Sequence, residues 1–218
     1  TALCIGNVKQ GFDIGKASEI LNVAQLTKNE CKKCWCFNMC TQCVSMAEQD
    51  GELSATRRLS NCLSVRKNIE NEIKNYDVVF LGVPCDYGAS YRLGAKYAPR
   101  QLREYSFWDR IYGEELYDLD HSECLKTNDF KIADLGDVYV NPTHPNENQD
   151  AISEKTNAIA RDSFPVICGG DHSITYGSFR GVYRAMKEKY SDYEIGIIHF
   201  DAHLDLDCLL YTSPSPRD

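Results

Sequence analysis

The sequence predicts an α/β protein in which helices cover a mainly parallel sheet, preceded by a small cysteine-rich unit. After Asn75, apolar runs alternate with helical patterns, as expected of parallel strands joined by helical crossovers. Before Asn75 the chain is polar and carries seven of the 11 cysteines. A length of 218 residues suffices for one large or two small domains. We therefore predict a first unit at residues 1–74 and a second from residue 75.

The apolar runs place the strands. They are residues 78–83, 132–135, 166–168 and 195–200. The clearest helix is 178–190, where five apolar residues are spaced to form a stripe expected to face the sheet: Phe179, Val182, Tyr183, Met186 and Tyr190. A charged stretch at 66–74 predicts a helix with a solvated face. Prolines at 142 and 145 predict a loop between Tyr139 and Gln149.

Composition excludes several classes of partner. The net charge of -8 argues against nucleic acid and anionic membranes. No apolar stretch approaches the length of a membrane span, and the N-terminus lacks a signal-peptide pattern. The sequence therefore predicts a cytoplasmic protein. It begins with Thr1 rather than Met, so we expect further residues upstream.

Two short strings predict a metal site. Residues 169–173 read Gly-Gly-Asp-His-Ser and residues 201–205 read Asp-Ala-His-Leu-Asp, each after an apolar run. Alternate residues of a strand point to one side, so Asp201, His203 and Asp205 can converge, with His172 as a fourth ligand. Oxygen ligands mixed with imidazole suit Mn²⁺ or another first-row divalent ion. The alternative on spacing alone is that these polar residues serve turn formation and solubility.

The residues around these strings resemble one known family. Residues 165–178 and 195–205 are similar to the first two metal-binding signatures of the ureohydrolases, the family of arginases and agmatinases. Residues 81–103 resemble that family's opening strand and substrate-side loop, and Asp134-Leu135-Gly136-Asp137 resembles its second-strand signature. The resemblance implies a three-layer arginase-like fold at residues 75–207 that hydrolyses a guanidino group to an amine and urea.

The same resemblance assigns roles to the site residues. It implies that His172, Asp201 and Asp205 bind one Mn²⁺ and that Asp201 and His203 bind a second, so that Asp201 bridges the pair. A guanidinium carbon is a poor electrophile, and two ions sharing one water would supply the hydroxide that attacks it, which gives Asp201 and His203 their catalytic role. We expect Asp171 to orient His172 or its loop. His199 is expected to pack or to support the ligands, and His121 and His144 to lie on the surface.

The cysteines predict a second kind of site. Cys31, Cys34, Cys40 and Cys43 form a C-x2-C-x5-C-x2-C run, with Cys62 further along the chain. In an intracellular chain such spacing is typical of a metal or cluster site, the alternatives being disulfides or free thiols. Cys85, Cys124 and Cys168 are expected to be small apolar residues.

Residues 4–8 and 26–67 resemble the SPASM extension of radical S-adenosylmethionine peptide maturases, which holds auxiliary [4Fe-4S] clusters. The resemblance implies that Cys31, Cys34, Cys40 and Cys62 bind the second auxiliary cluster, and that Cys4 and Cys43 belong to the first. The gap between Cys40 and Cys43 is two residues where that family more often has three. Cys36 is an extra thiol with no assigned role.

The C-terminal tail has an unusual sequence. Residues 208–218 read CLLYTSPSPRD and resemble the translated end of a transposase library adapter, the alternative being a natural Ser/Pro-rich linker. We therefore expect the natural sequence to diverge from this one after Asp207. The later aspartate pair of the ureohydrolases does not occur here, so the catalytic set is expected to be incomplete and the 218-residue chain inactive.

Several functions remain open on the sequence. The first is a ureohydrolase fused to a peptide maturase, acting on a small guanidino compound or on arginine within a ribosomal peptide, with oligomerisation allowed. The second is a free-agmatine hydrolase joined to the maturase segment by an assembly chimera. The third is a non-catalytic peptide-binding scaffold. A single-zinc deacetylase of the same fold is a fourth, and the two aspartates of 201–205 favour the two-metal branch.

Overall fold

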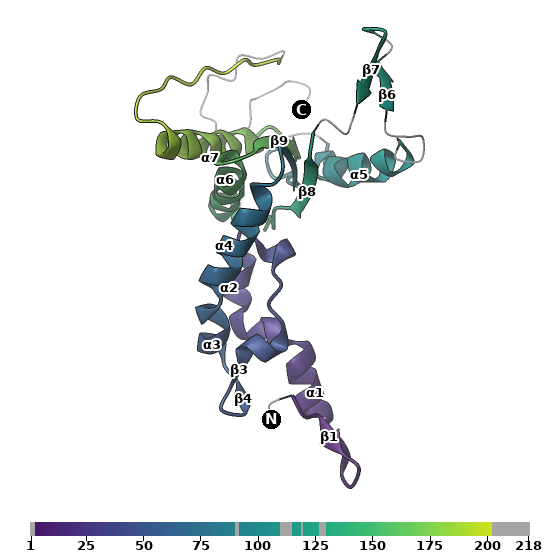
Figure 1. Ribbon diagram of the computed structural model, residues 1–218, viewed down its shortest axis with the longest axis vertical. Helices are drawn as coiled ribbons and strands as arrows, with labels where there is room; N and C mark the ends of the chain where they lie inside the picture. The colour runs from purple at the N-terminus through teal and green to yellow at the C-terminus, as the bar shows by residue number, and fades with distance from the viewer. Residues whose placement is uncertain (1–2, 90–91, 110–114, 119, 127–129, 202–218) are drawn as a thin grey trace. The chain divides into compact units, whose positions relative to one another are not determined.

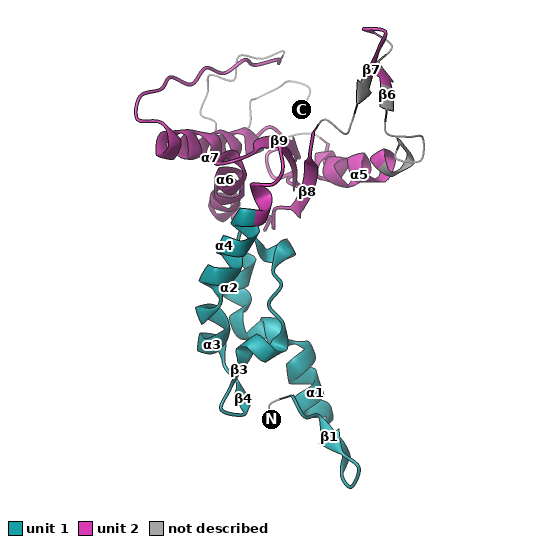
Figure 2. Ribbon diagram, in the orientation of Figure 1, with its two compact units in different colours: residues 1–71 teal, residues 72–218 magenta. Residues whose placement is uncertain are grey.

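The computed structural model describes residues 3–89, 92–109, 115–118, 120–126 and 130–201. The chain divides into two compact units, Thr1–Asn71 and Glu72–Asp218, shown in different colours in Figure 2. The division falls close to the change in composition near Asn75. Each unit is described below by itself.

The first unit is built from short elements (Figure 1). Its helices are α1 (Ile14–Leu21), α2 (Lys28–Lys32), α3 (Ala55–Ser60) and most of α4 (Cys62–Ile73), with 3-10 turns at Val23–Thr27, Phe37–Met39 and Val44–Ala47. Its two hairpins pair β1 (Gly6–Asn7) with β2 (Gly11–Phe12) and β3 (Glu48–Gln49) with β4 (Glu52–Leu53). Side-chain caps start two of the helices, because Asp13 accepts from Lys16 N–H at 2.9 Å and Ser54 accepts from Arg57 N–H at 3.2 Å.

A three-stranded parallel sheet forms the centre of the second unit. Its order is β8 (Ile132–Asp137), β5 (Val78–Val83), β9 (Phe164–Gly169). Val79, Leu81 and Val83 are fully buried, as expected for the central strand of a parallel sheet. The predictions of strands at 78–83, 132–135 and 166–168 are confirmed.

Helices surround this sheet. They are α5 (Ala98–Asp109), preceded by a 3-10 turn at Ala95–Tyr97, then α6 (Pro145–Ala160) and α7 (Ile174–Lys189). In Figure 1 the sheet lies between α5 and α6, and α7 packs against α6. A separate hairpin joins β6 (Glu115–Asp118) to β7 (Glu123–Lys126). Across the described ranges, no helix combines the length and apolarity needed to cross a membrane.

The buried face of α7 differs from the predicted one. Tyr183 and Tyr190 of the apolar stripe are 43% and 49% exposed. The face that packs on α6 carries three small residues, Gly177, Gly181 and Ala185. A Cβ at Gly181 would lie 2.6 Å from Ser153 O, so glycine lets the two helix backbones approach more closely than a large apolar side chain allows.

The prediction of a buried strand at 195–200 is wrong. This segment has no regular secondary structure, and Ile197, Ile198 and Phe200 are 65%, 85% and 95% exposed. A parallel strand requires hydrogen-bonded neighbours and cover on its faces. Among the described residues, no strand of the sheet pairs with 195–200. Apolar composition indicates that a segment needs cover, but it does not provide the neighbouring strand.

The loop predicted between Tyr139 and Gln149 ends earlier than expected, because α6 begins at Pro145. Proline suits the first position of a helix, where its missing N–H would have no partner within the helix and its fixed φ is already helical. His144 precedes it as the cap residue and is exposed, as predicted. Asn148 and Gln149 therefore lie in the first turns of a helix, and both are buried.

Candidate metal centre and its supporting loops

The loop that carries His172 leaves the sheet at the carboxyl end of β9. Gly170 N–H donates to Val83 O at 3.1 Å, and Asp171 N–H donates to Cys85 O at 2.8 Å. A Cβ at Gly170 would lie 2.8 Å from Cys85 N and closer still to Cys85 O. Only glycine allows the loops after β5 and β9 to lie this close.

Asp171 joins the loop that carries His172 to the loop after β5. Its Oδ2 accepts from Gly88 N–H at 2.6 Å, across to the loop after β5. Its Oδ1 accepts from Ser173 N–H at 2.9 Å and from the Ser173 hydroxyl. Both carboxylate oxygens are thus used in holding the loop around His172.

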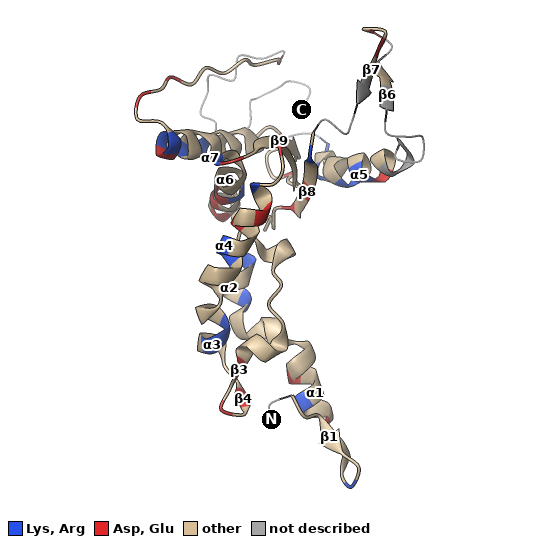
Figure 3. Ribbon diagram, in the orientation of Figure 1, with Lys and Arg blue, Asp and Glu red and all other residues tan. Residues whose placement is uncertain are grey.

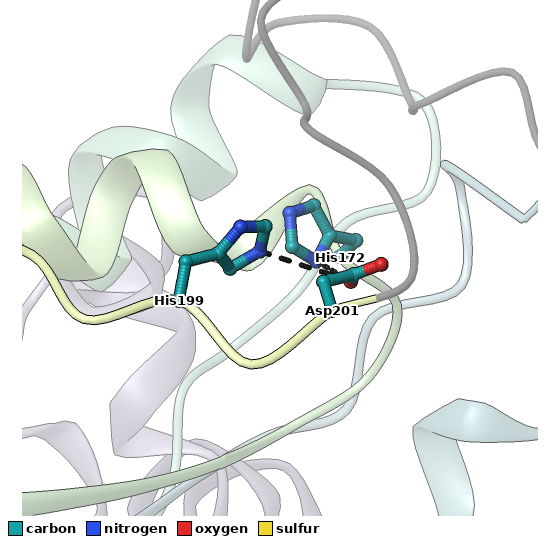
Figure 4. A group of neighbouring side chains, drawn as sticks. All are labelled: His172, His199 and Asp201. Carbon is teal, nitrogen blue, oxygen red and sulfur yellow. Dashed lines mark ion pairs between the residues drawn. The ribbon is translucent and has the colours of Figure 1, made fainter.

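Three ligand-type side chains come together at this place. His172 Nδ1 lies 4.0 Å from Asp201 Oδ2, and His199 Nε2 lies 3.8 Å from the same oxygen. The two imidazole rings are 5.7 Å apart between centroids. Figure 4 shows both rings beside the carboxylate, with His172 from the loop before α7 and the other two from the segment after it. In the part of the chain that the structure describes, this is the one group of three or more His, Cys, Asp or Glu with ligand atoms all within 4.8 Å.

The structure therefore brings together part of the predicted ligand set. His172 and Asp201 are neighbours, whereas His203 and Asp205 lie outside the described residues. His199, expected to pack or to support the ligands, is 38% exposed and stands beside Asp201. An imidazole and carboxylate donor set of this kind suits Mn²⁺ and other first-row divalent ions.

The loop after β5 is held by a buried carboxylate. Asp86 has a side chain that is 8% exposed. Its oxygens accept from Gly94 N–H at 2.9 Å and Lys96 N–H at 2.7 Å, and Lys96 Nζ lies 3.5 Å away. Beside it, burial raises the pKa of the Cys85 thiol to about 11, so Cys85 is an uncharged core residue, as predicted.

The two acidic residues of the second-strand signature bind an arginine from α5. Arg103 donates to both oxygens of Asp134, at 2.6 and 2.9 Å, and to Asp137 Oδ1 at 2.6 Å. Its guanidinium also lies over the Phe80 ring, 5.1 Å from the centroid. The bidentate contact with Asp134, opposed by partial burial, raises the pKa of Arg103. This cluster ties α5 to β5 and β8.

In the first unit, four of the predicted cluster cysteines line one cavity of about 340 Å³. They are Cys31, Cys34, Cys40 and Cys62, and the buried Cys36 joins them. Cys4 and Cys43 are exposed and do not line it. All cysteines of the described residues are free thiols, so no disulfide forms there.

Polar atoms around the cysteine cavity lack partners. Arg58 is 7% exposed, and its Nη1 has no hydrogen bond, nor do Arg66 Nε and Gln42 Oε1. All three residues line the cavity. In Figure 3, Lys and Arg recur along α2, α3 and α4 of this unit. Buried guanidinium nitrogens without a hydrogen-bond partner favour an anionic occupant.

Cys34 and Cys36 form a close pair in this cavity, with their sulfur atoms 3.4 Å apart. The hydrogen bond with Cys36, assisted by the charge of Arg66, lowers the pKa of Cys34 to about 5. The same hydrogen bond raises the pKa of Cys36. Cys34 is therefore a thiolate at neutral pH.

Two site-supporting residues were missed by the sequence analysis. Asp86 follows a strand as many surface acids do, and Gln149 lies in a polar stretch that predicts an exposed loop. Gln149 is only 4% exposed and contacts three segments of the site. No pattern in the sequence marks either residue, because their importance comes from distant backbone groups.

The fold and the site define the class: an α/β protein with a candidate metal centre at the carboxyl end of a parallel sheet. The sequence profile of the Arginase family matches residues 76–215. The chain belongs to the arginase family.

Curated relatives agree with this assignment. Mitochondrial agmatinase of Gallus gallus is 33% identical over 150 residues, covering 68% of this chain and 41% of its own length. Mitochondrial guanidino acid hydrolase of Homo sapiens is 34% identical, covering 68% and 39%. Agmatinase of Bacillus subtilis is 34% identical, covering 62% and 42%. The chain thus spans about two fifths of the length of these relatives.

Among solved structures, proclavaminate amidino hydrolase from Streptomyces clavuligerus aligns with a TM-score of 0.42 at 29% identity, over 53% of this chain and 35% of its own.

Proposed function

We propose that this chain forms part of a metal-dependent ureohydrolase that hydrolyses a guanidino group to an amine and urea. The observation that carries the proposal is the convergence of His172, His199 and Asp201 in a chain of the arginase family. Bound divalent ions would lower the pKa of a coordinated water and so supply a nucleophile strong enough for a guanidinium carbon.

Particular residues would hold the ions. His172, Asp201 and Asp205 would bind one Mn²⁺, and Asp201 and His203 a second, with Asp201 shared. Asp171 would keep His172 in place through its bonds to Gly88 and Ser173. The donor types support this assignment, since imidazole nitrogen and carboxylate oxygen both occur within 4.8 Å of each other.

The proposed substrates are small guanidino compounds. The relatives named above are called agmatinases and guanidino acid hydrolases, and a further relative, from Clostridium tetani, is a formimidoylglutamase. We test the proposal on the protein encoded by the complete gene, purified with Mn²⁺, by measuring urea released from agmatine, from arginine and from an arginine-containing peptide. We expect urea from at least one of them.

Variants of the proposed ligands, with a matched histidine control, make this test specific. His172→Ala and Asp201→Asn should abolish urea release, because each removes a ligand of the proposed centre. The control is His144→Ala, since His144 is an exposed histidine, directly before α6, that does not belong to the group of His172, His199 and Asp201. Full activity in His172→Ala would contradict the proposed site.

A second function rests on the cysteine cavity. We propose that residues 1–74 form a cytoplasmic cluster-binding domain in which Cys31, Cys34, Cys40 and Cys62 hold a [4Fe-4S] cluster. These residues line one cavity, and the unpaired Arg58 and Arg66 atoms would face the negative charge of a thiolate-bound cluster.

Anaerobic reconstitution with iron and sulfide tests the cluster. We expect visible absorbance and bound iron that Cys34→Ser and Cys62→Ser reduce strongly, whereas Cys124→Ser, which changes an exposed cysteine of the second unit, does not. Failure to bind iron in the unaltered protein would refute the cluster. Binding of a cluster would support an arginine-containing peptide as the substrate. Urea release from free agmatine but not from the peptide would refute the peptide as substrate.

A further inference from the structure

Gln149 of α6 connects the loop after β5, the loop that carries His172 and the first turn of α7. Its Nε2 donates to Ser173 O at 2.8 Å and to Tyr87 Oη at 2.5 Å, and its Oε1 accepts from Gly177 N–H at 2.8 Å. Ser173 follows His172 directly, and Tyr87 lies in the loop after β5. The side chain of Gln149 thus holds one neighbour in each segment.

The amide enters the first turn of α7 in an unusual way. Ser173 C=O and Gly177 N–H are four residues apart, the spacing of two groups that an ordinary first turn would join directly. The amide of Gln149 lies between them and satisfies both, donating to the first and accepting from the second. The start of α7 is therefore set by a side chain from α6.

The glycine at position 177 leaves room for this contact. A Cβ at Gly177 would lie 2.6 Å from Gln149 Oε1 and 2.9 Å from Gln149 O. Any other residue at 177 would displace the amide. Arg180 adds a contact from the next turn, donating to Gln149 O at 3.2 Å.

We propose that Gln149 is a positioning residue that holds the His172 loop in its metal-binding conformation. The inference rests on the proposed metal centre. A ligand on a loop binds an ion tightly only if its backbone is already fixed, because otherwise binding must also order the loop. Asp171 fixes this loop on the side of β5, and Gln149 fixes it on the side of α6 and α7.

The test uses Gln149→Met, which keeps a side chain of similar length but removes all three hydrogen bonds. Its control is Ser153→Ala, a change one turn further along α6 at a fully buried hydroxyl that makes no hydrogen bond. Gly177→Ala is a second variant, which leaves Gln149 in the sequence but pushes its amide away. All variants are made in the protein encoded by the complete gene.

The first measurement needs no metal. Amide hydrogen exchange is followed in EDTA, and we expect exchange at Gly177 to rise roughly 5- to 10-fold in Gln149→Met, because its acceptor is lost. Gly177→Ala should likewise raise exchange at Ser173 and Ile174, while Ser153→Ala should leave exchange at Ser173, Ile174 and Gly177 unchanged. Unchanged exchange in Gln149→Met refutes the positioning role whether or not the protein binds metal.

The second measurement is Mn²⁺ affinity, from the electron paramagnetic resonance signal of free Mn²⁺. We expect Gln149→Met and Gly177→Ala to weaken binding about 10- to 100-fold, the usual effect of removing a group that orients a ligand, and saturating Mn²⁺ to restore urea release. Wild-type affinity in Gln149→Met, with altered exchange, would show that Gln149 packs the helix without serving the metal, and would overturn the inference. If Gln149→Met alters exchange but the wild-type protein binds no Mn²⁺, the proposed function is refuted and the loop-holding role of Gln149 is kept.

Discussion

Gly170→Ala provides a direct test of how the His172 loop is built. The new Cβ would lie 2.8 Å from Cys85 N and 2.9 Å from Cys85 C, distances that real Cβ atoms do not show. The contacting atoms belong to the backbone, so they cannot turn away as a flexible side chain would. The loops after β5 and β9 must therefore separate.

The separation has an energetic cost that the structure allows us to work out. Overpacking a tight contact costs about 1–3 kcal/mol. Two hydrogen bonds cross the same gap, Gly170 N–H to Val83 O and Asp171 N–H to Cys85 O, and weakening each costs about 0.5–1.5 kcal/mol. We therefore expect the free energy of unfolding of the second unit to fall by about 2–6 kcal/mol.

Urea unfolding followed by circular dichroism measures this change. The slope m is compared between the variant and the wild type, because equal slopes show that both unfold in the same two-state manner. The control is Gly196→Ala, where a Cβ would meet nothing within 4 Å and where we expect no loss of stability. Equal stabilities for the two variants, or a loss below about 1 kcal/mol in Gly170→Ala, would refute the close approach of the two loops.

Two further predictions concern charge. Arg103→Lys should lower the free energy of unfolding by about 1.5–3 kcal/mol, because a single ammonium group cannot make the bidentate contact that the guanidinium makes with Asp134. Arg100→Lys, which changes an exposed ion pair, is the control and should have no measurable effect in the same urea-unfolding assay. In metal-free protein at pH 7, iodoacetamide should label Cys34 and spare Cys85, because their pKa values of about 5 and about 11 leave one ionised and the other neutral. Labelling of Cys34, read by mass spectrometry, should slow as the pH falls through about 5, and equal labelling of both thiols at pH 7 would contradict the lowered pKa.

The sequence by itself determined the sheet and the chemistry of the site. The run 78–83 became β5, the central strand, because a parallel strand covered on both faces must be apolar along its whole length. The runs 132–135 and 166–168 became the edge strands β8 and β9, which are apolar for part of their length and partly exposed. The strings around His172 and Asp201 indicated metal-ligand residues, and the structure places these two side chains together. Apolar runs and ligand strings are contiguous in the sequence, so they can be recognised before the fold is known.

Tertiary structure decided how these parts are covered and supported. The segment 195–200 has the composition of a strand but remains exposed, since pairing depends on a neighbour that composition does not supply. The packing face of α7 consists of glycines and an alanine, because the distance between two helices, and not hydrophobicity, selects the residues there. Gln149 acquires its role only when α6 brings its amide to the first turn of α7. A polar side chain has no fixed meaning in sequence, because its partners are backbone groups that only the folded chain brings within hydrogen-bonding distance.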